Sequence, residues 1–169
     1  IFTFPSLLSN LSYLTHCTMN RDEAKLHFLL HAAALVRELV QAELRPLGVG
    51  HSQARVLDAL NRMGPASQAQ LATELNITAP SMSTMAMRLI ASGDVLRQPD
   101  PKEKRSNIMS LSKEGHALLS EIRVAWHRVD HAIDQRLGSE AATTFFDTSR
   151  QLRDTLGGRS PGKKSGTSS

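Results

Sequence analysis

The sequence predicts a mainly α-helical domain with one small β-hairpin, and two observations indicate this class. Apolar residues recur at three- and four-residue steps over most of the chain, which is the spacing of amphipathic helices. Hydrophobic residues make up 40% of the 169 residues and aromatic residues only 4%, a composition that suits packed helices better than a β-sandwich. This length is sufficient for one domain with its own core.

The first predicted helix spans 23–47, where apolar residues follow the helical spacing until Pro46 and the Gly-Val-Gly after it. A second helix begins after Gly50 and stops at the Gly-Pro pair that starts at Gly64. Gly50 stands at the expected N-cap position of this second helix, where glycine is a tolerable but weak cap.

Two short helices follow, joined by a turn of three or four residues. Ser67 and Gln70 form a capping-box pattern at the start of the first. The second has Thr78 as its expected N-cap, Pro80 in its first turn and Gly93 just past its end. This arrangement is the helix-turn-helix pattern.

The second of these helices presents mainly small polar side chains on its predicted outer face. They are Ser81, Ser83, Thr84 and Arg88. Small hydroxyl side chains let a helix backbone approach a DNA major groove, and they can bond to base edges and phosphates. We predict DNA contacts for this set; the alternative is that they are ordinary surface residues. Met82 and Met85 are expected in the core rather than in a ligand pocket.

Residues 94–112 depart from the helical spacing and predict a β-hairpin, with β-like runs at 94–98 and 107–112. A hairpin directly after a helix-turn-helix makes a winged helix, and we call residues 94–112 the wing. Positions 97–105 hold four basic and two acidic residues. A solvated tip is one interpretation, but the preceding helix-turn-helix favours contact with phosphates or a groove. For Arg97, a phosphate contact and a solubilising charge at a strand end remain equal alternatives.

A long helix is predicted after Ser112, which with Glu114 would cap it. Its apolar stripe is expected to consist of Leu118, Ile122, Trp126, Val129 and Ile133. The Gly-Ser-Glu at 138–140 separates it from a final helix with apolar residues at Phe145, Leu152 and Leu156.

The two ends of the chain are expected to lie outside the folded part, 21–156. Residues 1–20 lack the basic segment and the cleavage site of a secretory signal, and Met19 opens a stretch that looks like a natural start. We interpret 1–20 as an N-terminal extension. The basic, low-complexity tail 157–169 is expected to be disordered.

Charge and cysteine content limit the partners that this chain is expected to have. Lys and Arg number 20 against 16 for Asp and Glu, so the net charge of +4 permits a polyanionic partner without requiring one. The single cysteine, Cys17, excludes an internal disulfide framework and fits a reducing cytoplasm. No apolar run reaches membrane-spanning length, so no membrane partner is expected.

Four segments together resemble the MarR family of bacterial transcription regulators. They are "QARVLDAL" at 53–60, "QLATELNIT" at 70–78, "RLIASGDVLRQPDPKEKRS" at 88–106 and "SLSKEG" at 110–115. The resemblance implies a homodimer held by dimerisation helices at 23–47 and 112–156. It also implies a winged helix at 50–112 that reads one half of a palindromic DNA operator, and a small-molecule effector that releases DNA. By family habit the regulator would be a repressor.

The resemblance assigns the tip of the wing to DNA. The family pattern D-P-x-D-R-R corresponds here to Asp-Pro-Lys-Glu-Lys-Arg at 100–105. Arg105 is the candidate for a minor-groove contact, since narrow grooves attract an inserted guanidinium. Lys102 and Lys104 complete the predicted DNA-binding set, although Lys104 cannot form the bidentate fork of the family's arginine.

Histidines and one tryptophan are candidates for sensing. His27, His31 and Trp126 are proposed to line an effector pocket. The simpler interpretation is that the histidines occupy ordinary polar positions and that Trp126 packs between helices. The family's peroxide-sensing branch has a reactive cysteine where His27 stands, so thiol sensing is disfavoured. An alternative effector is zinc, bound by His27 and His31 or by His127 and His131, since pairs four residues apart on a helix can share a metal.

No enzyme signature is present in the sequence. It has no G-x-S-x-G elbow, no phosphate-cradling glycine loop and no H-E-x-x-H, so neither an enzyme nor a cofactor is expected. The alternative from another class is a winged-helix module that binds proteins and not DNA. The basic wing and the Ser/Thr-rich helix argue against that alternative.

Overall fold

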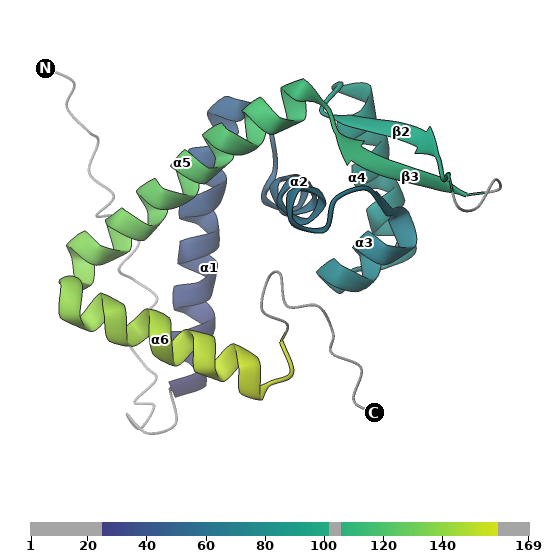
Figure 1. The fold of residues 1–169 in the computed structure, drawn as a ribbon. Coiled ribbons are helices and arrows are strands. Elements are labelled where there is room, and N and C mark those ends of the chain that lie inside the picture. The colour runs from purple at the N-terminus through teal and green to yellow at the C-terminus, as the bar shows by residue number, and fades with distance from the viewer. Residues whose placement is uncertain (1–24, 102–105, 159–169) are drawn as a thin grey trace, which may run out of the picture. The chain divides into compact units, whose positions relative to one another are not determined.

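The computed structural model describes residues 25–101 and 106–158. Backbone contacts divide the chain into two units, Ile1–Arg37 and Glu38–Ser169. The predicted extension at 1–20 lies outside the described residues, as does all of the predicted tail beyond 158. Figure 1 gives the order of the elements along the chain.

Helix α1, Lys25–Leu44, begins in the first unit and ends in the second, and the 3-10 helix η2, Arg45–Leu47, follows it. The predicted helix at 23–47 is therefore confirmed over its described length. The side chains at 25–35 are all exposed, the apolar ones included, whereas Leu44 is fully buried. The chain then leaves η2 through Gly48, whose φ of 69° is left-handed, as the sequence predicts for a stop after Pro46.

Helix α2, His51–Met63, begins after Gly50, whose N–H donates to Gln53 Oε1 over 3.2 Å. Glycine at this N-cap has no side chain to accept from the first turn, so only one half of a capping box is formed. Helix α3, Gln68–Leu75, has the full box. Ser67 N–H donates to Gln70 Oε1 over 2.8 Å, and Ser67 Oγ accepts from Gln70 N–H over 3.2 Å.

A three-stranded antiparallel sheet carries the wing. Its strands lie in the order β1 (Ala66–Ser67), β3 (Asn107–Leu111) and β2 (Val95–Pro99). The predicted hairpin is confirmed as β2, Val95–Pro99, paired with β3, Asn107–Leu111. The structure adds β1, Ala66–Ser67, in which Ala66 pairs with Met109. A two-residue strand in a turn has no periodicity of its own, so the sequence did not predict it.

The core of the second unit lies where α2, α3, α4 (Ala79–Ala91) and the sheet pack together (Figure 1). Helix α2 contributes Ala54, Val56, Leu57, Ala59 and Leu60. Met82 is fully buried and Met85 is partly buried against the same cluster, as predicted. Val95 and Met109 close the core from the sheet.

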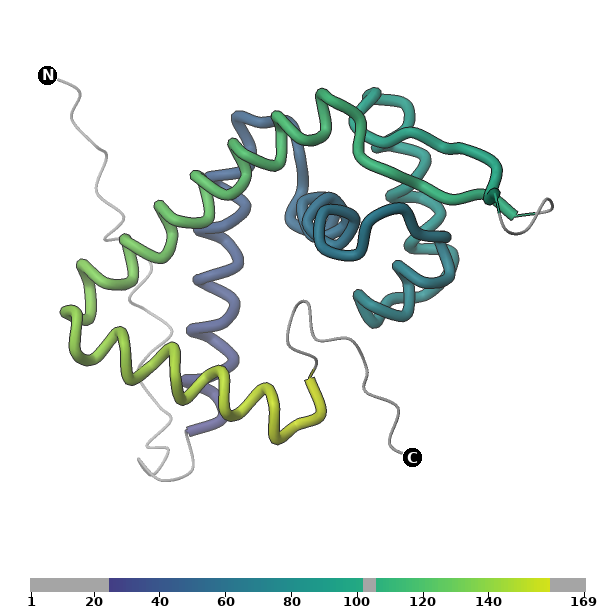
Figure 2. The backbone as a smooth tube through the Cα atoms, in the orientation of Figure 1, coloured from purple at the N-terminus to yellow at the C-terminus, as the bar shows by residue number. Residues whose placement is uncertain are grey.

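Helix α5, Lys113–Leu137, follows β3, and the backbone then turns at Gly138 into α6, Ser139–Thr155 (Figure 2). Leu118, Ile122 and Trp126 of the predicted stripe of α5 pack against the core, but the stripe omits the buried residues Leu119 and Ala125. The buried side chains are those of Leu119, Ile122, Ala125 and Val129, while those of Leu118, Trp126 and Ile133 are only half-buried. Apolar residues stand on both sides of this stripe, so spacing alone could not decide between neighbouring faces of the helix.

Phe145, Leu152 and Leu156 of the final predicted helix are exposed within the chain, by 39%, 42% and 78%. Only Ala142 of α6 is buried. In the parts of the chain that the structure describes, no helix combines the length and the hydropathy needed to span a membrane.

Candidate nucleic-acid interface

Helix α4 is held by caps at both ends. Thr78 Oγ1 accepts from Ser81 N–H over 3.3 Å, and Pro80 stands in the first turn, where no intrahelical donor is needed. Past the end of the helix, Gly93 has a φ of 83°. Met82, Ala86 and Leu89 bury one face in the core, with exposures of 1% or less, so the opposite face is the one left for a partner.

The hydroxyl residues predicted to contact DNA differ in what they can offer. Ser81 is exposed, and its Oγ accepts from Thr78 Oγ1 over 2.9 Å, which leaves its own O–H hydrogen free to donate. Thr84 is exposed, but its hydroxyl donates to Pro80 O over 3.1 Å. It can therefore meet a base through its methyl group or as an acceptor only. Ser83 is half-buried at the edge of the face.

Arg88 is exposed on the same helix and has no ion pair among the residues that the structure describes. It borders a hollow together with Gln53, Ser92, Asp94 and Leu118. A guanidinium without an acidic partner is free to contact a phosphate or a guanine edge.

The wing places Arg97 in the middle of β2, opposite Met109, with an exposed side chain. Asp100 and Ser106 close the base of the tip. Asp100 N–H donates to Ser106 O over 3.0 Å, and Ser106 Oγ donates to Asp100 Oδ2 over 3.3 Å. The other predicted wing contacts, Lys102, Lys104 and Arg105, lie outside the described residues.

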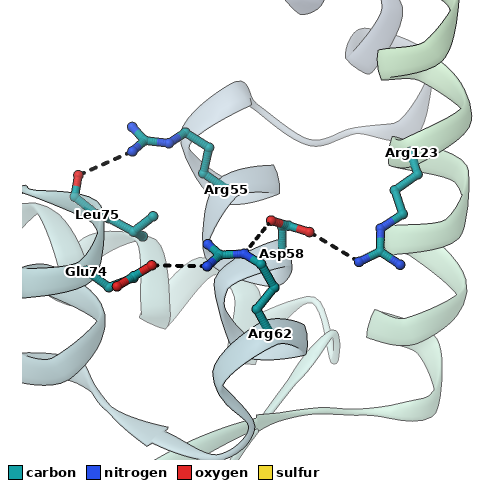
Figure 3. Close-up of polar contacts among 6 residues, drawn as sticks. All are labelled: Arg55, Asp58, Arg62, Glu74, Leu75 and Arg123. Carbon is teal, nitrogen blue, oxygen red and sulfur yellow. Dashed lines mark hydrogen bonds and ion pairs between the residues drawn. The ribbon is translucent and has the colours of Figure 1, made fainter. Parts of the chain in front are cut away.

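A charged network joins α2 to α3 and α5 (Figure 3). Arg62 Nε lies 3.0 Å from Asp58 Oδ2, and Arg62 Nη1 lies 3.0 Å from Glu74 Oε1. Arg123 on α5 reaches the other oxygen of Asp58 over 3.2 Å. Burial alone would lower the pKa of Arg62, but hydrogen bonds and charges from Asp58 and Glu74 outweigh it and raise the pKa.

This network links α3, through α2, to α5. Arg55 adds to it, since its Nη2 donates to Leu75 O over 3.3 Å at the C-terminal end of α3 (Figure 3). Sequence reasoning missed these residues. The spacing of Asp58 and Arg62, four residues apart on a helix, was the only local signal.

The histidine candidates are exposed. The ring centroids of His27 and His31 lie 5.8 Å apart, and His127 Nδ1 lies 3.9 Å from Asp130 Oδ2. Among the described residues, no group of three or more His, Cys, Asp or Glu side chains is placed to hold a metal ion. His131 is likewise exposed, and Trp126 packs half-buried against the core.

The second unit contains a winged helix-turn-helix. It is made by the helix-turn-helix of α3 and α4, the adjoining hairpin of β2 and β3, and the exposed face of α4. A sequence model of the MarR family matches residues 47–106, which include α2, α3, α4 and β2. The HTH-type transcriptional repressor Rv2887 of Mycobacterium tuberculosis is 30% identical over 125 residues, which cover 73% of this chain and 90% of that protein. The uncharacterised HTH-type transcriptional regulator YwoH of Bacillus subtilis is 31% identical over 99 residues, which cover 59% of this chain and 72% of that protein.

Solved structures show the same fold. The transcriptional repressor CouR bound to a 23-mer DNA duplex has a TM-score of 0.73 and 24% identity, over 82% of this chain and 99% of that one. The reduced form of MarR from E. coli has a TM-score of 0.69 and 21% identity, over 75% and 95%. The chain belongs to the MarR family of winged helix-turn-helix transcription regulators, which bind DNA and are not enzymes.

Proposed function

We propose that this chain is a cytoplasmic, homodimeric repressor that binds a palindromic operator and releases it when a small molecule binds. The observation that carries the proposal is the exposed outer face of α4 beside the hairpin, with Arg88 and Arg97 exposed. Proteins that use this architecture place the second helix of the helix-turn-helix in the major groove.

In this proposal the DNA-binding part is 50–112. Ser81, at the N-terminal end of α4, donates to a phosphate, where the helix dipole also favours negative charge. Arg88, Ser83 and Thr84 face base edges or sugar-phosphate oxygens. On the wing, Arg97, Lys102 and Lys104 contact phosphates, and Arg105 enters the minor groove.

Dimerisation through 23–47 and 112–156 is supported by apolar side chains that are exposed in a single chain. On α1 they include Leu26, Phe28 and Leu30, with exposures of 60–65%. On α6 they include Phe145 and Leu152. Exposed apolar surface of this kind marks a contact with another protein surface, and a second copy of this chain supplies the same surfaces.

The effector is proposed to be an organic small molecule that contacts His27, His31 or Trp126. A ligand can release DNA only if it binds one state of the dimer more tightly than the other. Because the proposed effector is an organic molecule, added zinc should leave the DNA affinity unchanged, with and without a chelator. A zinc-dependent shift would instead favour the histidine pairs as a metal sensor.

The proposal is tested by titrating the full chain against the DNA upstream of its own gene at several salt concentrations. We expect the logarithm of the binding constant to fall linearly as the logarithm of the salt concentration rises. The slope should be about −0.9 for each phosphate contacted. Arg105→Ala should weaken binding by about 1–3 kcal/mol and leave the dimer intact.

The matched control is Arg136→Ala, because Arg136 donates to its own helix at Ala132 O and lies outside the DNA-binding part. Its DNA affinity should equal that of the wild type. Unchanged affinity in Arg105→Ala would remove the wing assignment. Binding that does not depend on salt would contradict the proposed function.

A further inference from the structure

One exposed line of α4 is mostly apolar. Met87 is 61% exposed, although methionine is usually buried. At 100° per residue, Pro80, Thr84, Met87 and Ala91 fall within an arc of about 60°. All four are exposed. We call this set the outward arc.

The outward arc lies opposite the face that α4 buries. Met82, Ala86 and Leu89 have exposures of 0%, 1% and 1%. The outward arc is therefore the part of α4 that reaches deepest into a groove when the helix enters it. Ser83 borders the arc on one side, and Ser81 and Arg88 border it on the other, so the polar side chains flank an apolar centre.

The outward arc offers no free hydrogen-bond donor. The hydroxyl of Thr84 already donates to Pro80 O over 3.1 Å, proline has no N–H, and the Met87 thioether is at most a weak acceptor. In the major groove the apolar feature of an unmodified base pair is the 5-methyl group of thymine. An unbranched, polarisable methionine side chain adapts well to such a small apolar target.

We propose that Met87, assisted by the methyl group of Thr84, reads thymine 5-methyl groups in the major groove and so determines part of the operator sequence. Each half-site then carries thymine beneath the middle of α4, and Arg88 contacts a position to one side. This inference rests on the proposed DNA-binding function and adds to it the chemistry of the recognised base.

The test uses the full chain and a DNA duplex that the wild type selects from a randomised library. Each thymine of one half-site is replaced in turn by deoxyuridine, which removes the methyl group and keeps every hydrogen-bonding atom. At the contacted position we expect the Kd of the wild type to rise about fourfold, the equivalent of about 0.8 kcal/mol per buried methyl group.

With Met87→Ala the same replacement should change the Kd by less than about 1.5-fold, because the partner of the methyl group is already absent. Met87→Leu, which keeps an apolar side chain of similar volume, should retain most of the wild-type response. Met63→Ala is the matched control. Met63 is 41% exposed, but it is the last residue of α2, outside α4 and the wing, and is not a proposed DNA contact, so this variant should respond as the wild type does.

Two results would overturn the inference. The first is that no deoxyuridine replacement weakens DNA binding by the wild type. The second is that Met87→Ala loses as much DNA affinity as the wild type does when thymine is replaced by deoxyuridine. In both cases salt-dependent binding to the selected duplex would still support the proposed function. If the wild type selects no duplex, the proposed function fails and this inference fails with it.

Discussion

Gly115 shows how a single residue positions the long helix. An ideal Cβ at this residue would lie 2.0 Å from Asp94 O, far inside van der Waals contact. The same carbonyl accepts from Ser112 N–H over 3.0 Å, and Ser112 Oγ accepts from Gly115 N–H over 2.9 Å. Since Asp94 lies only three residues beyond Ala91, the last residue of α4, these contacts tie that end to the first turn of α5.

Gly115→Ala should therefore lower the free energy of unfolding by about 1–3 kcal/mol, because the clash is with backbone that cannot move aside easily. Without the clash, alanine in a helix would raise stability. Urea unfolding at a fixed protein concentration measures the change. The neighbouring exposed residue provides the control, His116→Ala, with a change within about 0.5 kcal/mol. Equal stability of Gly115→Ala and the wild type would contradict the account.

At the residue scale, the sequence placed the hydroxyls and Arg88 of α4 correctly on an exposed or half-buried face. The sequence placed Met82 and Met85 in the core and assigned no role to Met87, which is exposed where Met82 is buried. The difference between the two is which side of α4 faces α2 and α3, and that depends on packing between elements.

At the element scale, the Asp58–Arg62–Glu74 network joins α2 to α3, the first helix of the helix-turn-helix. The side chains are about 20% exposed, so the charges are only partly screened by solvent. Because the pKa of Arg62 is raised, the stability linked to the proton of Arg62 is fully present below its ordinary pKa and is lost as the pH rises through the raised pKa.

Arg62→Ala should destabilise the fold by about 1–2 kcal/mol, since it removes the cation that pairs with Glu74 and leaves Asp58 paired with Arg123 alone among the described residues. The effect is below that of a fully buried pair. Thermal or urea unfolding measures it. Arg150→Ala removes an ion pair whose side chains are 65% and 63% exposed, and should cost less than about 0.5 kcal/mol. Similar losses in the two variants would show that the network has no special role.

At the scale of the whole molecule, the exposed apolar residues of α6 are expected to be covered by a second copy of the chain. Leu152 is 42% exposed on this helix. Leu152→Glu should raise the dimer dissociation constant at least about tenfold, because a charge would be buried in an apolar contact. Analytical ultracentrifugation measures this constant. The adjacent exposed polar residue gives the control, Gln151→Glu. A chain that is monomeric at all concentrations would contradict the proposed dimer.

The sequence by itself determined where α2 to α5 begin, because a helix cap is a contact within about three residues. Ser67 with Gln70, Thr78 and Ser112 all form the hydrogen bonds that their spacing predicts. The hairpin followed for the same reason, since its strands are separated only by the short tip of the wing.

Tertiary structure alone decided the features that join distant residues. Strand β1 exists only because Ala66 meets Met109, and α5 buries Leu119 and Ala125 rather than Leu118 and Trp126 because of the surface it packs against. The ion pair of Arg123 with Asp58 and the space left by Gly115 are decided in the same way. Such contacts depend on which face of one element meets another, and no spacing within a single element specifies that.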